Sequence, residues 1–313
     1  MAASWGVRDI PAQRGRRVVV TGATGGLGYE TALALAGAGA AVVLAGRNAG
    51  KGKAAVARIL GVHHGADVRF MPLDLASLAS VASFAARLLA EDRPIDLLVN
   101  NAGIMALPTR QTTADGFEAQ FGTNHLGHFA LTLRLLPLLR RGAAPRVVTV
   151  SSLMHARGSI RFDDLQSRDY APWRAYAQSK LANLLFAQEL ARRSAAAGWG
   201  IASMAAHPGW ARTDLVANGP GKTDRGGLTW LAVQLAAPIF AQSAAAGALP
   251  ILFAATAADA ASGGYYGPQG MGELTGRPGP ARIAPQAGDA AVAARLWAES
   301  ARLVGVTTEA MAA

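Results

Sequence analysis

The chain has 313 residues, of which 51% are hydrophobic and 16% are charged, and this composition excludes a disordered protein. It contains no cysteine, so disulfides, thiolate metal sites and a cysteine nucleophile are excluded as well. The formal net charge of +10 comes almost entirely from arginine and could attract phosphate, nucleic acid or an anionic membrane. Because no long run of basic residues occurs, we interpret the charge as a scattered basic surface and expect no nucleic-acid partner. The N-terminal residues contain no apolar stretch of signal-peptide length, and we expect a cytoplasmic protein.

Apolar segments of strand length alternate with helical patterns along most of the chain. The predicted strands are residues 17–21, 41–45, 68–72, 96–100, 146–151 and 201–207. The helical patterns include one long helix over residues 117–141 and a helix that begins after residue 172. Strands that are apolar throughout and separated by helices indicate a parallel sheet covered on both faces. We therefore predict an α/β fold with a doubly wound parallel sheet, a three-layer α/β/α Rossmann fold, in a single domain of residues 1–313.

The last third of the chain is less regular. Residues 209–243 are expected to form a long loop or lid over the substrate, and residues 263–280 are rich in turn-forming glycine and proline. Residues 226–258 contain no charge, and such a length could cross a bilayer. The residues that interrupt this apolar stretch are Gln234, Pro238, Gln242, Ser243 and Pro250. We expect two helices there and no membrane span, with peripheral membrane contact as the alternative.

The segment TGATGGLG, residues 21–28, follows the first predicted strand and precedes a helical pattern. Glycines at such a turn let backbone N–H groups approach a pyrophosphate, and the helix N-terminus adds a favourable dipole. The spacing TGxxxGxG, which uses Gly22, Gly26 and Gly28, suggests a single-domain hydride-transfer enzyme. The spacing TGxxGxxG uses Gly25 in place of Gly26 and suggests a larger enzyme of the nucleotide-sugar type. Either spacing predicts a dinucleotide site.

The end of the second predicted strand bears on the choice of dinucleotide. An NAD site usually places Asp or Glu there to accept a hydrogen bond from the ribose 2′-hydroxyl, but Gly46 stands at that position and Arg47 follows. An arginine can pair with a 2′-phosphate, whereas a carboxylate would repel it. We therefore predict that NADP(H) is the preferred cofactor and keep NAD(H) as the alternative.

A tyrosine and a lysine four residues apart, Tyr176 and Lys180, lie on one face of the helix after residue 172. A free phenol has a pKa near 10, and a nearby ammonium would lower it, so that Tyr176 could exchange a proton with a substrate oxygen. Ser151 and Ser152 end the fifth strand at the edge of the sheet where ligands of parallel sheets bind. Asn124, amid apolar residues, is either a satisfied core amide or a site residue.

Three histidines lie close to these residues in the sequence. His125 and His128 have no acidic neighbour at metal-ligand spacing, so we interpret them as packing or pocket residues and predict no metal site. His155 fits equally well as a residue at the substrate entrance and as a surface residue.

The glycine-rich turn of residues 21–28 is followed along the chain by Asn124, Ser152, Tyr176 and Lys180. In this order, these motifs resemble the short-chain dehydrogenase/reductase family over residues 16–215. The resemblance favours Gly22, Gly26 and Gly28 as the functional glycines, with Gly25 as an additional small residue. It implies that Tyr176 is the general acid/base and that Lys180 lowers its pKa and binds the nicotinamide ribose. It also implies that Ser152 binds the substrate oxygen and that Asn124 holds a water in a proton relay behind Lys180. The implied cofactor contacts are Gly22, Thr24, Gly25, Gly26, Leu27, Gly28, Arg47, Asp74, Leu75, Asn101, Ala102, Gly103, Tyr176, Lys180, Pro208, Gly209 and Thr213.

More narrowly, SSLMHARGSIRFDDLQ followed by AYAQSKLANLLFAQEL is similar to the retinol dehydrogenase and protochlorophyllide reductase-like branch of that family. This implies a small lipophilic alcohol or carbonyl substrate. A catalytically silent NADP(H)-binding regulator is the alternative function, because one fold hosts many functions. Homo-oligomers are common in the family, often through the helix of Tyr176 and its neighbour, so a homo-oligomer is a further expectation.

Overall fold

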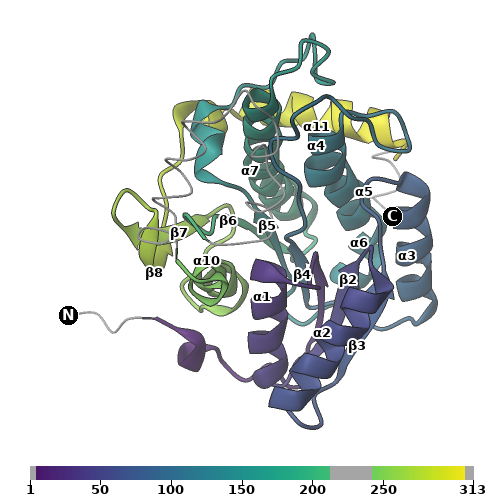
Figure 1. Ribbon diagram of the computed structural model, residues 1–313, viewed down its shortest axis with the longest axis vertical. Coiled ribbons are helices and arrows are strands. Elements are labelled where there is room, and N and C mark those ends of the chain that lie inside the picture. The colour runs from purple at the N-terminus through teal and green to yellow at the C-terminus, as the bar shows by residue number, and fades with distance from the viewer. Residues whose placement is uncertain (1–4, 212–241, 307–313) are drawn as a thin grey trace.

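The computed structural model of the chain describes residues 5–211 and 242–306. Within these residues lies an eight-stranded sheet with the order β3-β2-β1-β4-β5-β6-β7-β8 (Figure 1). The strands are β1 Arg17–Thr21, β2 Ala41–Gly46, β3 Val68–Pro72, β4 Leu97–Asn100, β5 Arg146–Val150, β6 Ala202–Ala206, β7 Tyr265–Gly270 and β8 Thr275–Pro280. All neighbouring strands are parallel except β7 and β8. The predicted doubly wound parallel sheet is therefore confirmed.

The first six strands match the predicted segments to within one residue at each end. The central strands β1 and β4 are buried along their whole length, as apolar strands covered on both faces must be. The strand order turns back between β1, which is followed by β2 on one side, and β4, which continues the sheet on the other. In such sheets a ligand crevice lies beyond the carboxyl ends of the strands at this reversal.

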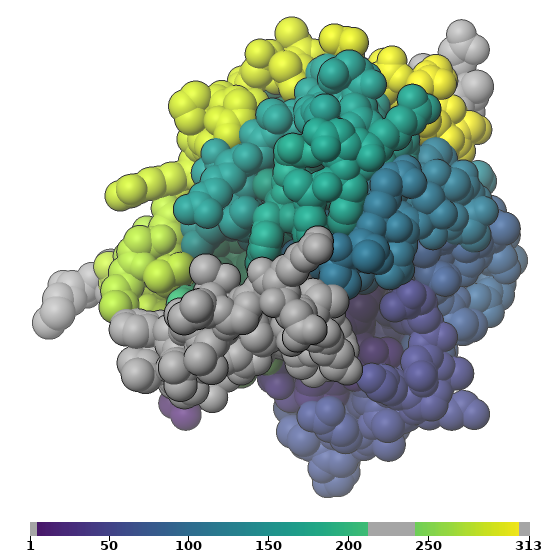
Figure 2. All heavy atoms as spheres, turned by 45° about the horizontal axis from the view of Figure 1, so that its top comes forward, coloured from purple at the N-terminus to yellow at the C-terminus, as the bar shows by residue number. Residues whose placement is uncertain are grey.

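Helices cover both faces of the sheet. The α-helices are α1 Gly26–Gly37, α2 Ala49–Val62, α3 Leu78–Ala90, α4 Ala119–Phe121, α5 Gly127–Arg134, α6 Leu136–Leu139, α7 Pro172–Ala197, α10 Ala244–Thr256 and α11 Ala290–Val304. Short 3₁₀ turns are η1 Val7–Asp9, η3 Leu153–Arg157 and η4 Pro285–Gly288, and η2 Gly122–Leu126 is a π-helical turn. Residues of α1, α2 and α10 share one core with the sheet, and residues of α3, α5, α7 and α11 share the other. Figure 2 shows the N-terminal segments, in purple and blue, at one end of the molecule and the C-terminal segments, in yellow, at the other.

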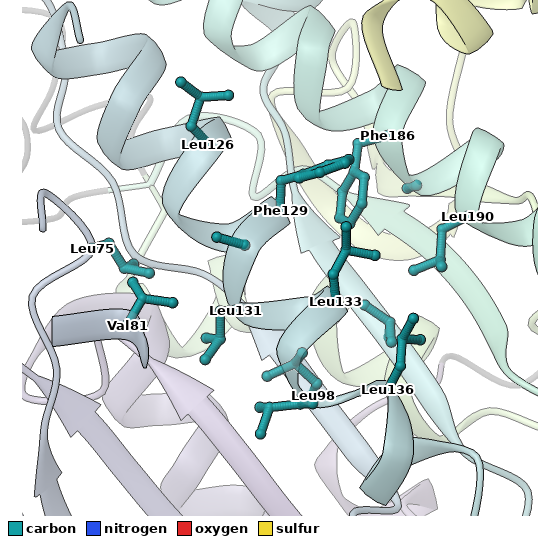
Figure 3. Packing of buried hydrophobic residues seen from close by; sticks show 14 of the residues in the cluster. Leu75, Val81, Leu98, Leu126, Phe129, Leu131, Leu133, Leu136, Phe186 and Leu190 are labelled. Atoms are coloured by element: carbon teal, nitrogen blue, oxygen red, sulfur yellow. The ribbon is translucent and has the colours of Figure 1, made fainter. Parts of the chain in front are cut away.

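The second of these cores is built on leucine and aromatic side chains. Figure 3 shows Leu98 of β4 below α5, with Phe129 of α5 lying beside Phe186 of α7. The ring of Trp297, from α11, meets Phe129 edge-on at 5.0 Å between centroids and stacks on Phe186 at 5.8 Å. Trp297 is fully buried, and burying a side chain of this size stabilises the fold by a few kcal/mol (about 2–3). The chain thus closes the outer face of α5 and α7 with its own C-terminal helix.

The glycine- and proline-rich residues 263–280, which the sequence suggested as turns, contain the two outermost strands. β7 pairs with β6 through Tyr265 and Tyr266, and β8 runs back antiparallel along it. Prolines lack the N–H of a sheet ladder and are tolerated on an edge strand, the position that β8 occupies. The two tyrosines, both buried, supply the apolar anchors that the local composition concealed.

The single long helix predicted over residues 117–141 is wrong, because this segment is divided into α4, η2, α5 and α6. The π-helical turn η2 contains Asn124, whose side chain bonds backbone groups of another loop. Leu135 separates α5 from α6, which has Pro137 near its start. Polar side chains and proline thus compete with regular helical hydrogen bonds here.

The structure describes only part of the predicted lid, residues 209–243, and of the uncharged stretch, residues 226–258. Residues 212–241, which make up most of the predicted lid and half of the uncharged stretch, lie outside the described residues. The described part of the uncharged stretch forms α10, which packs on α1 and the sheet. Among the residues described, no helix combines the length and hydropathy that a membrane crossing requires.

Candidate active site

A cavity of about 620 Å³ lies at the carboxyl ends of the strands, where the sheet order turns back. The predicted site residues that line it are Gly22, Thr24, Gly25, Gly26, Leu27, Gly28, Arg47, Asp74, Leu75, Asn101, Ala102, Gly103, Ser152, Tyr176, Lys180, Pro208 and Gly209. Asn124 lies in the protein interior next to this cavity, and Thr213 lies outside the described residues. The structure therefore gathers residues from six strand ends into one site.

The turn between β1 and α1 distinguishes the two glycine spacings on steric grounds. Gly22 and Gly26 have positive φ angles of 65° and 52°, which favour glycine, whereas Gly25 is extended at −172°. A Cβ on Gly22 would lie 2.8 Å from the Ala102 Cα, and a Cβ on Gly28 would lie 2.5 Å from the Gly22 carbonyl oxygen. The steric need for glycine is thus seen at the positions of the TGxxxGxG spacing.

Hydrogen bonds tie this turn to the loop after β4. The Thr21 hydroxyl accepts from the backbone N–H groups of Asn101 and Ala102 at 2.9 and 3.0 Å. The Asn101 side chain donates to the Thr21 carbonyl at 2.8 Å. The floor of the cavity between β1 and β4 is therefore held by the side chains of two predicted site segments.

Basic side chains gather at the end of β2. Arg47 is exposed and lines the cavity, as does Lys51 one turn further along α2. Asn48 caps that helix by accepting from the Lys51 N–H at 2.9 Å. A Cβ on Gly46 would lie 3.0 Å from the Thr24 Cγ2, so a larger residue there would crowd the glycine turn. Lys51 was not predicted from the sequence, although it follows Arg47 by four residues and lies in the first turn of the helix that begins after this strand.

The third strand contributes Asp74 and Leu75 to the same end of the cavity. The Asp74 carboxylate accepts from the Ala76 N–H at 3.0 Å, and its own N–H donates to the Ser80 hydroxyl at 2.9 Å. Leu75 is buried, and its carbonyl oxygen would lie 2.4 Å from a Cβ on Gly127. The loop after β3 is therefore fixed against α5 at the position where the sequence predicts contact with adenine.

At the opposite end, Tyr176, Lys180 and Ser152 converge from α7 and the end of β5. Burial raises the pKa of Tyr176 to about 12, and a hydrogen-bonding contact with the Ser152 side chain acts in the opposite direction. Burial lowers the pKa of Lys180 to about 8. The Lys180 ammonium donates to the Val150 carbonyl at 3.1 Å and lies 5.7 Å from the centre of the Tyr176 ring. The predicted lowering of the tyrosine pKa by Lys180 is not seen, because burial dominates in this cavity.

The two adjacent serines have different surroundings. The Ser151 hydroxyl is buried and donates to the Lys180 carbonyl at 2.7 Å, so it joins the end of β5 to α7. The half-buried Ser152 caps η3 by accepting from the Met154 N–H at 3.2 Å and keeps its side chain against Tyr176. Of the two serines, Ser152 is the one that faces the tyrosine.

Asn124 is fully buried, and its side chain makes three bonds. It accepts from the Ile104 N–H at 2.8 Å and donates to the Ile104 carbonyl and the Ser179 hydroxyl at 2.9 and 3.0 Å. A Cβ on Gly103 would lie 3.2 Å from the Asn124 Oδ1 and 3.6 Å from the Lys180 Nζ. A side chain at Gly103 would therefore crowd the Asn124 amide, and the water relay remains a prediction.

The histidines next to Asn124 are packing residues, as the sequence predicted. His128 bonds the Asn124 carbonyl and the Thr21 hydroxyl at 2.9 Å each, and His125 bonds the Ser300 hydroxyl at 2.8 Å. Burial lowers their pKa values to about 4 and about 3, so both are uncharged at neutral pH. No group of three metal-ligating side chains occurs among the described residues.

His155 is buried behind Ser152 and is not a surface residue. Its Nε2 accepts from the Ala284 N–H at 3.3 Å, so its Nδ1 carries the proton and donates to the Ser152 carbonyl at 2.8 Å. The Tyr265 hydroxyl donates to the same carbonyl at 3.3 Å. Two side chains thus hold the backbone of the serine that faces the cavity.

Large apolar side chains complete the cavity around Tyr176. The apolar lining residues that the sequence analysis did not identify are Ile104, Met105, Leu153, Met154, Trp173, Trp210 and Leu274. They come from five separate segments, so no local pattern could have grouped them. A cavity with apolar walls and a few polar groups at one end suits a small, largely apolar ligand.

A glycine turn at a helix N-terminus, a strand-end serine and a buried Tyr–Lys pair around one cavity define a nicotinamide-dependent oxidoreductase. The family model described as short chain dehydrogenase matches residues 16–222. The chain is 45% identical over 299 residues to human retinol dehydrogenase 13, covering 93% of this chain and 85% of the relative. The protein belongs to the short-chain dehydrogenase/reductase family, in the branch of the retinol dehydrogenases, and is an oxidoreductase acting on CH–OH groups.

Solved structures agree with this assignment. A crystal structure of a protein from Mycobacterium paratuberculosis has 42% identity and a TM-score of 0.80, covering 97% of this chain and 98% of that one. The NADP complex of RhlG from Pseudomonas aeruginosa has 26% identity and a TM-score of 0.63, covering 81% and 94% of the two chains. The relatives thus support both the fold and the binding of a nicotinamide dinucleotide.

Proposed function

We propose that the protein transfers a hydride between NADP(H) and a lipophilic alcohol or carbonyl compound, with Tyr176 as the general acid/base. The observation that carries the proposal is the position of Tyr176 and Ser152 at the junction of the glycine-turn end and the apolar end of one cavity. The name of retinol dehydrogenase 13, a relative at 45% identity, supports an apolar alcohol as substrate.

The residues at the end of β2 support NADP(H) over NAD(H). Arg47 and Lys51 place two cations beside the cavity, and Gly46 leaves no carboxylate to repel a 2′-phosphate. The steric limits at Gly22 and Gly28 also fit a pyrophosphate held close to the backbone at the start of α1. The NADP complex of RhlG is in line with this choice.

Ser152 and Tyr176, at the apolar end of the cavity, have different roles in the reaction. Bound NADPH supplies the hydride. In the reductive direction, Ser152 donates a hydrogen bond that orients the carbonyl oxygen, and Tyr176 donates the proton as negative charge develops there. A phenol whose pKa is about 12 stays protonated at neutral pH and is suited to this donor role. The apolar side chains around it exclude water from the substrate.

The test compares Tyr176→Phe with the wild type. We expect turnover of NADPH with a panel of lipophilic aldehydes and ketones to fall by about 10²–10⁴-fold, because general acid catalysis is lost. Binding of NADPH, followed by its fluorescence, should stay within about threefold, a small free-energy change. Tyr170→Phe is the matched control, since the hydroxyl of this half-buried tyrosine donates to the Leu107 carbonyl at 2.8 Å and Tyr170 is not among the cavity residues.

Two outcomes would contradict the proposal in different ways. Turnover that survives in Tyr176→Phe would remove this residue from the mechanism. A wild-type protein that binds NADPH but turns over no member of a broad panel would instead favour the catalytically silent regulator.

A further inference from the structure

The turn between β7 and β8, residues 271–274, is built against the cofactor end of β6. Leu274 lines the cavity, and its carbonyl accepts from the Trp210 N–H at 2.9 Å. A Cβ on Gly209, whose φ is +64°, would lie 2.3 Å from that same carbonyl oxygen. The turn therefore touches both the substrate wall and the Pro208–Gly209 segment, for which the sequence predicts contact with the nicotinamide.

A second connection runs through His207. The Gly209 N–H donates to the His207 Nδ1 at 3.2 Å, so the proton of this imidazole is on Nε2. The Nε2 nitrogen lies 3.2 Å from a carboxylate oxygen of Glu273, to which its N–H donates. The other oxygen of Glu273 accepts from the Arg282 N–H at 2.9 Å. One carboxylate thus links the β7–β8 turn, the segment after β8 and the imidazole that shapes the turn after β6.

The imidazole of His207 has no freedom to adopt another orientation. It is completely buried and packs against Tyr265, with 5.2 Å between the ring centres. A Cβ on Gly267 would lie 1.9 Å from its Nε2, so the ring fills the space beside that glycine. Burial lowers its pKa to about 3, so the ring is neutral at physiological pH and keeps one donor and one acceptor. A ring that cannot rotate transmits the position of Glu273 directly to Gly209.

The backbone of the turn is strained. Met271 and Glu273 have positive φ angles of 46° and 66°, a conformation that costs non-glycine residues about 1 kcal/mol or more each. Strain of this kind persists only where surrounding contacts over-determine it, and here the contacts are those of the Glu273 carboxylate. A glycine at position 273 would adopt the same φ without strain, yet the chain carries a glutamate.

We infer that Glu273 is a positioning residue for the reaction, which holds Gly209 through His207 and sets the position of Leu274 in the substrate wall. The inference rests on the proposed function for the role of the cavity. The β7–β8 turn then affects both the affinity for NADP(H) and the size of the substrate that the cavity accepts.

The test uses Glu273→Gly, which removes the carboxylate and relieves the backbone strain. We expect the melting temperature to stay within a few degrees, because the two effects on stability oppose one another. The dissociation constant for NADPH, measured without substrate, should rise about tenfold, because the Gly209 segment is then no longer held in one position before the cofactor binds. The ratio of KM values for a bulky and a small lipophilic aldehyde should change, with kcat for the small aldehyde within about twofold of the wild type.

Two further variants show whether Glu273 acts through His207. Glu273→Gln keeps one oxygen acceptor but turns its NH₂ group toward one of the two donors, His207 or Arg282. It should therefore bind NADPH more tightly than Glu273→Gly but less tightly than the wild type. His207→Asn keeps an acceptor where Nδ1 lies and loses the bond to Glu273. The double variant Glu273→Gly/His207→Asn should bind NADPH no more weakly than His207→Asn alone. Glu299→Gln, in an exposed pair with Arg302 on α11, is the control and should change nothing.

Glu273→Gly with unchanged NADPH affinity and an unchanged KM ratio would overturn the inference. Fully additive losses in the double variant would do so too, because the carboxylate would then act by another route. The NADPH affinity is independent of the Tyr176→Phe test, since it is measured without turnover. A failure of the proposed chemistry and a failure of the positioning role are thus distinguishable.

Discussion

Arg47 and Lys51 are the two residues on which the choice between NADP(H) and NAD(H) depends. Both line the cavity at the start of α2, and Lys51 is exposed, as is Arg47. An arginine presents a planar fork of donors to a phosphate, whereas a lysine acts as a point charge. The two side chains can therefore act together on one 2′-phosphate without competing for the same geometry.

We predict that Arg47→Ala raises the KM for NADPH by about 10–100-fold and Lys51→Ala by about tenfold, the range for lost charged hydrogen bonds. The KM for NADH should change by less than about twofold in both variants, a negligible free-energy change. Steady-state rates with each cofactor check this, and Lys53→Ala on the exposed side of α2 is the control. Equal effects on the two cofactors would show that these cations do not discriminate between them.

The pairing of Tyr176 with Ser152 could be predicted at this scale, but the protonation of Tyr176 could not. A strand end and a helix face brought the two side chains together by rules that apply to every parallel sheet. Burial is a property of the whole cavity, and it raises the pKa of Tyr176 although the sequence predicted a lowering by Lys180. Lys51 could have been found as a second cation four residues after Arg47, whereas Trp210 and Leu274 lie far from the other cavity residues in the chain.

At the scale of single elements, the turn between β1 and α1 makes opposite demands on neighbouring glycines. Gly22 needs a positive φ and has no room for a Cβ, while Gly25 is extended and makes no such conformational demand. We predict that Gly22→Ala destabilises the protein by about 1–3 kcal/mol and weakens NADPH binding. Gly25→Ala should leave the melting temperature nearly unchanged.

Thermal unfolding and NADPH titration of both alanine variants check this prediction. The two glycine spacings of the sequence make different demands here, because TGxxGxxG requires Gly25 and TGxxxGxG does not. If Gly25→Ala proved as damaging as Gly22→Ala, the steric argument for the TGxxxGxG spacing would fail.

The hairpin of β7 and β8 shows where prediction from sequence stops. Apolar runs in the sequence predict the first six strands, because sheets of this kind are covered on both faces. β7 and β8 are rich in glycine and proline, and what makes them strands is their pairing with β6 and the burial of Tyr265 and Tyr266. A residue such as Glu273, whose partner His207 lies far away in the chain, becomes visible only once that pairing is known.

For the whole molecule, α11 determines which surfaces are available for self-association. The sequence suggested a homo-oligomer through the helix of Tyr176 and its neighbour, but part of that face of α5 and α7 is already covered by Trp297 of α11. The guanidinium of Arg193 also lies 4.6 Å from the centre of the Trp297 ring, on the side of α7. A second copy would have to displace this helix and give up its buried apolar contacts.

We therefore predict that the wild-type protein does not dimerise through α5 and α7. Trp297→Glu should loosen α11, destabilise the fold by about 3–5 kcal/mol and promote association of the uncovered apolar faces. Ala298→Glu places the same charge one residue further, at an exposed position of α11, and should leave both stability and oligomeric state unchanged. Light scattering after size-exclusion chromatography and thermal unfolding check the pair of variants. A wild-type dimer in which Trp297 stays buried and whose interface is formed by α5 and α7 would contradict the prediction. A wild-type dimer that Ala298→Glu converts to monomers would instead mean that α11 is itself an interface, and the expectation for that variant would be wrong.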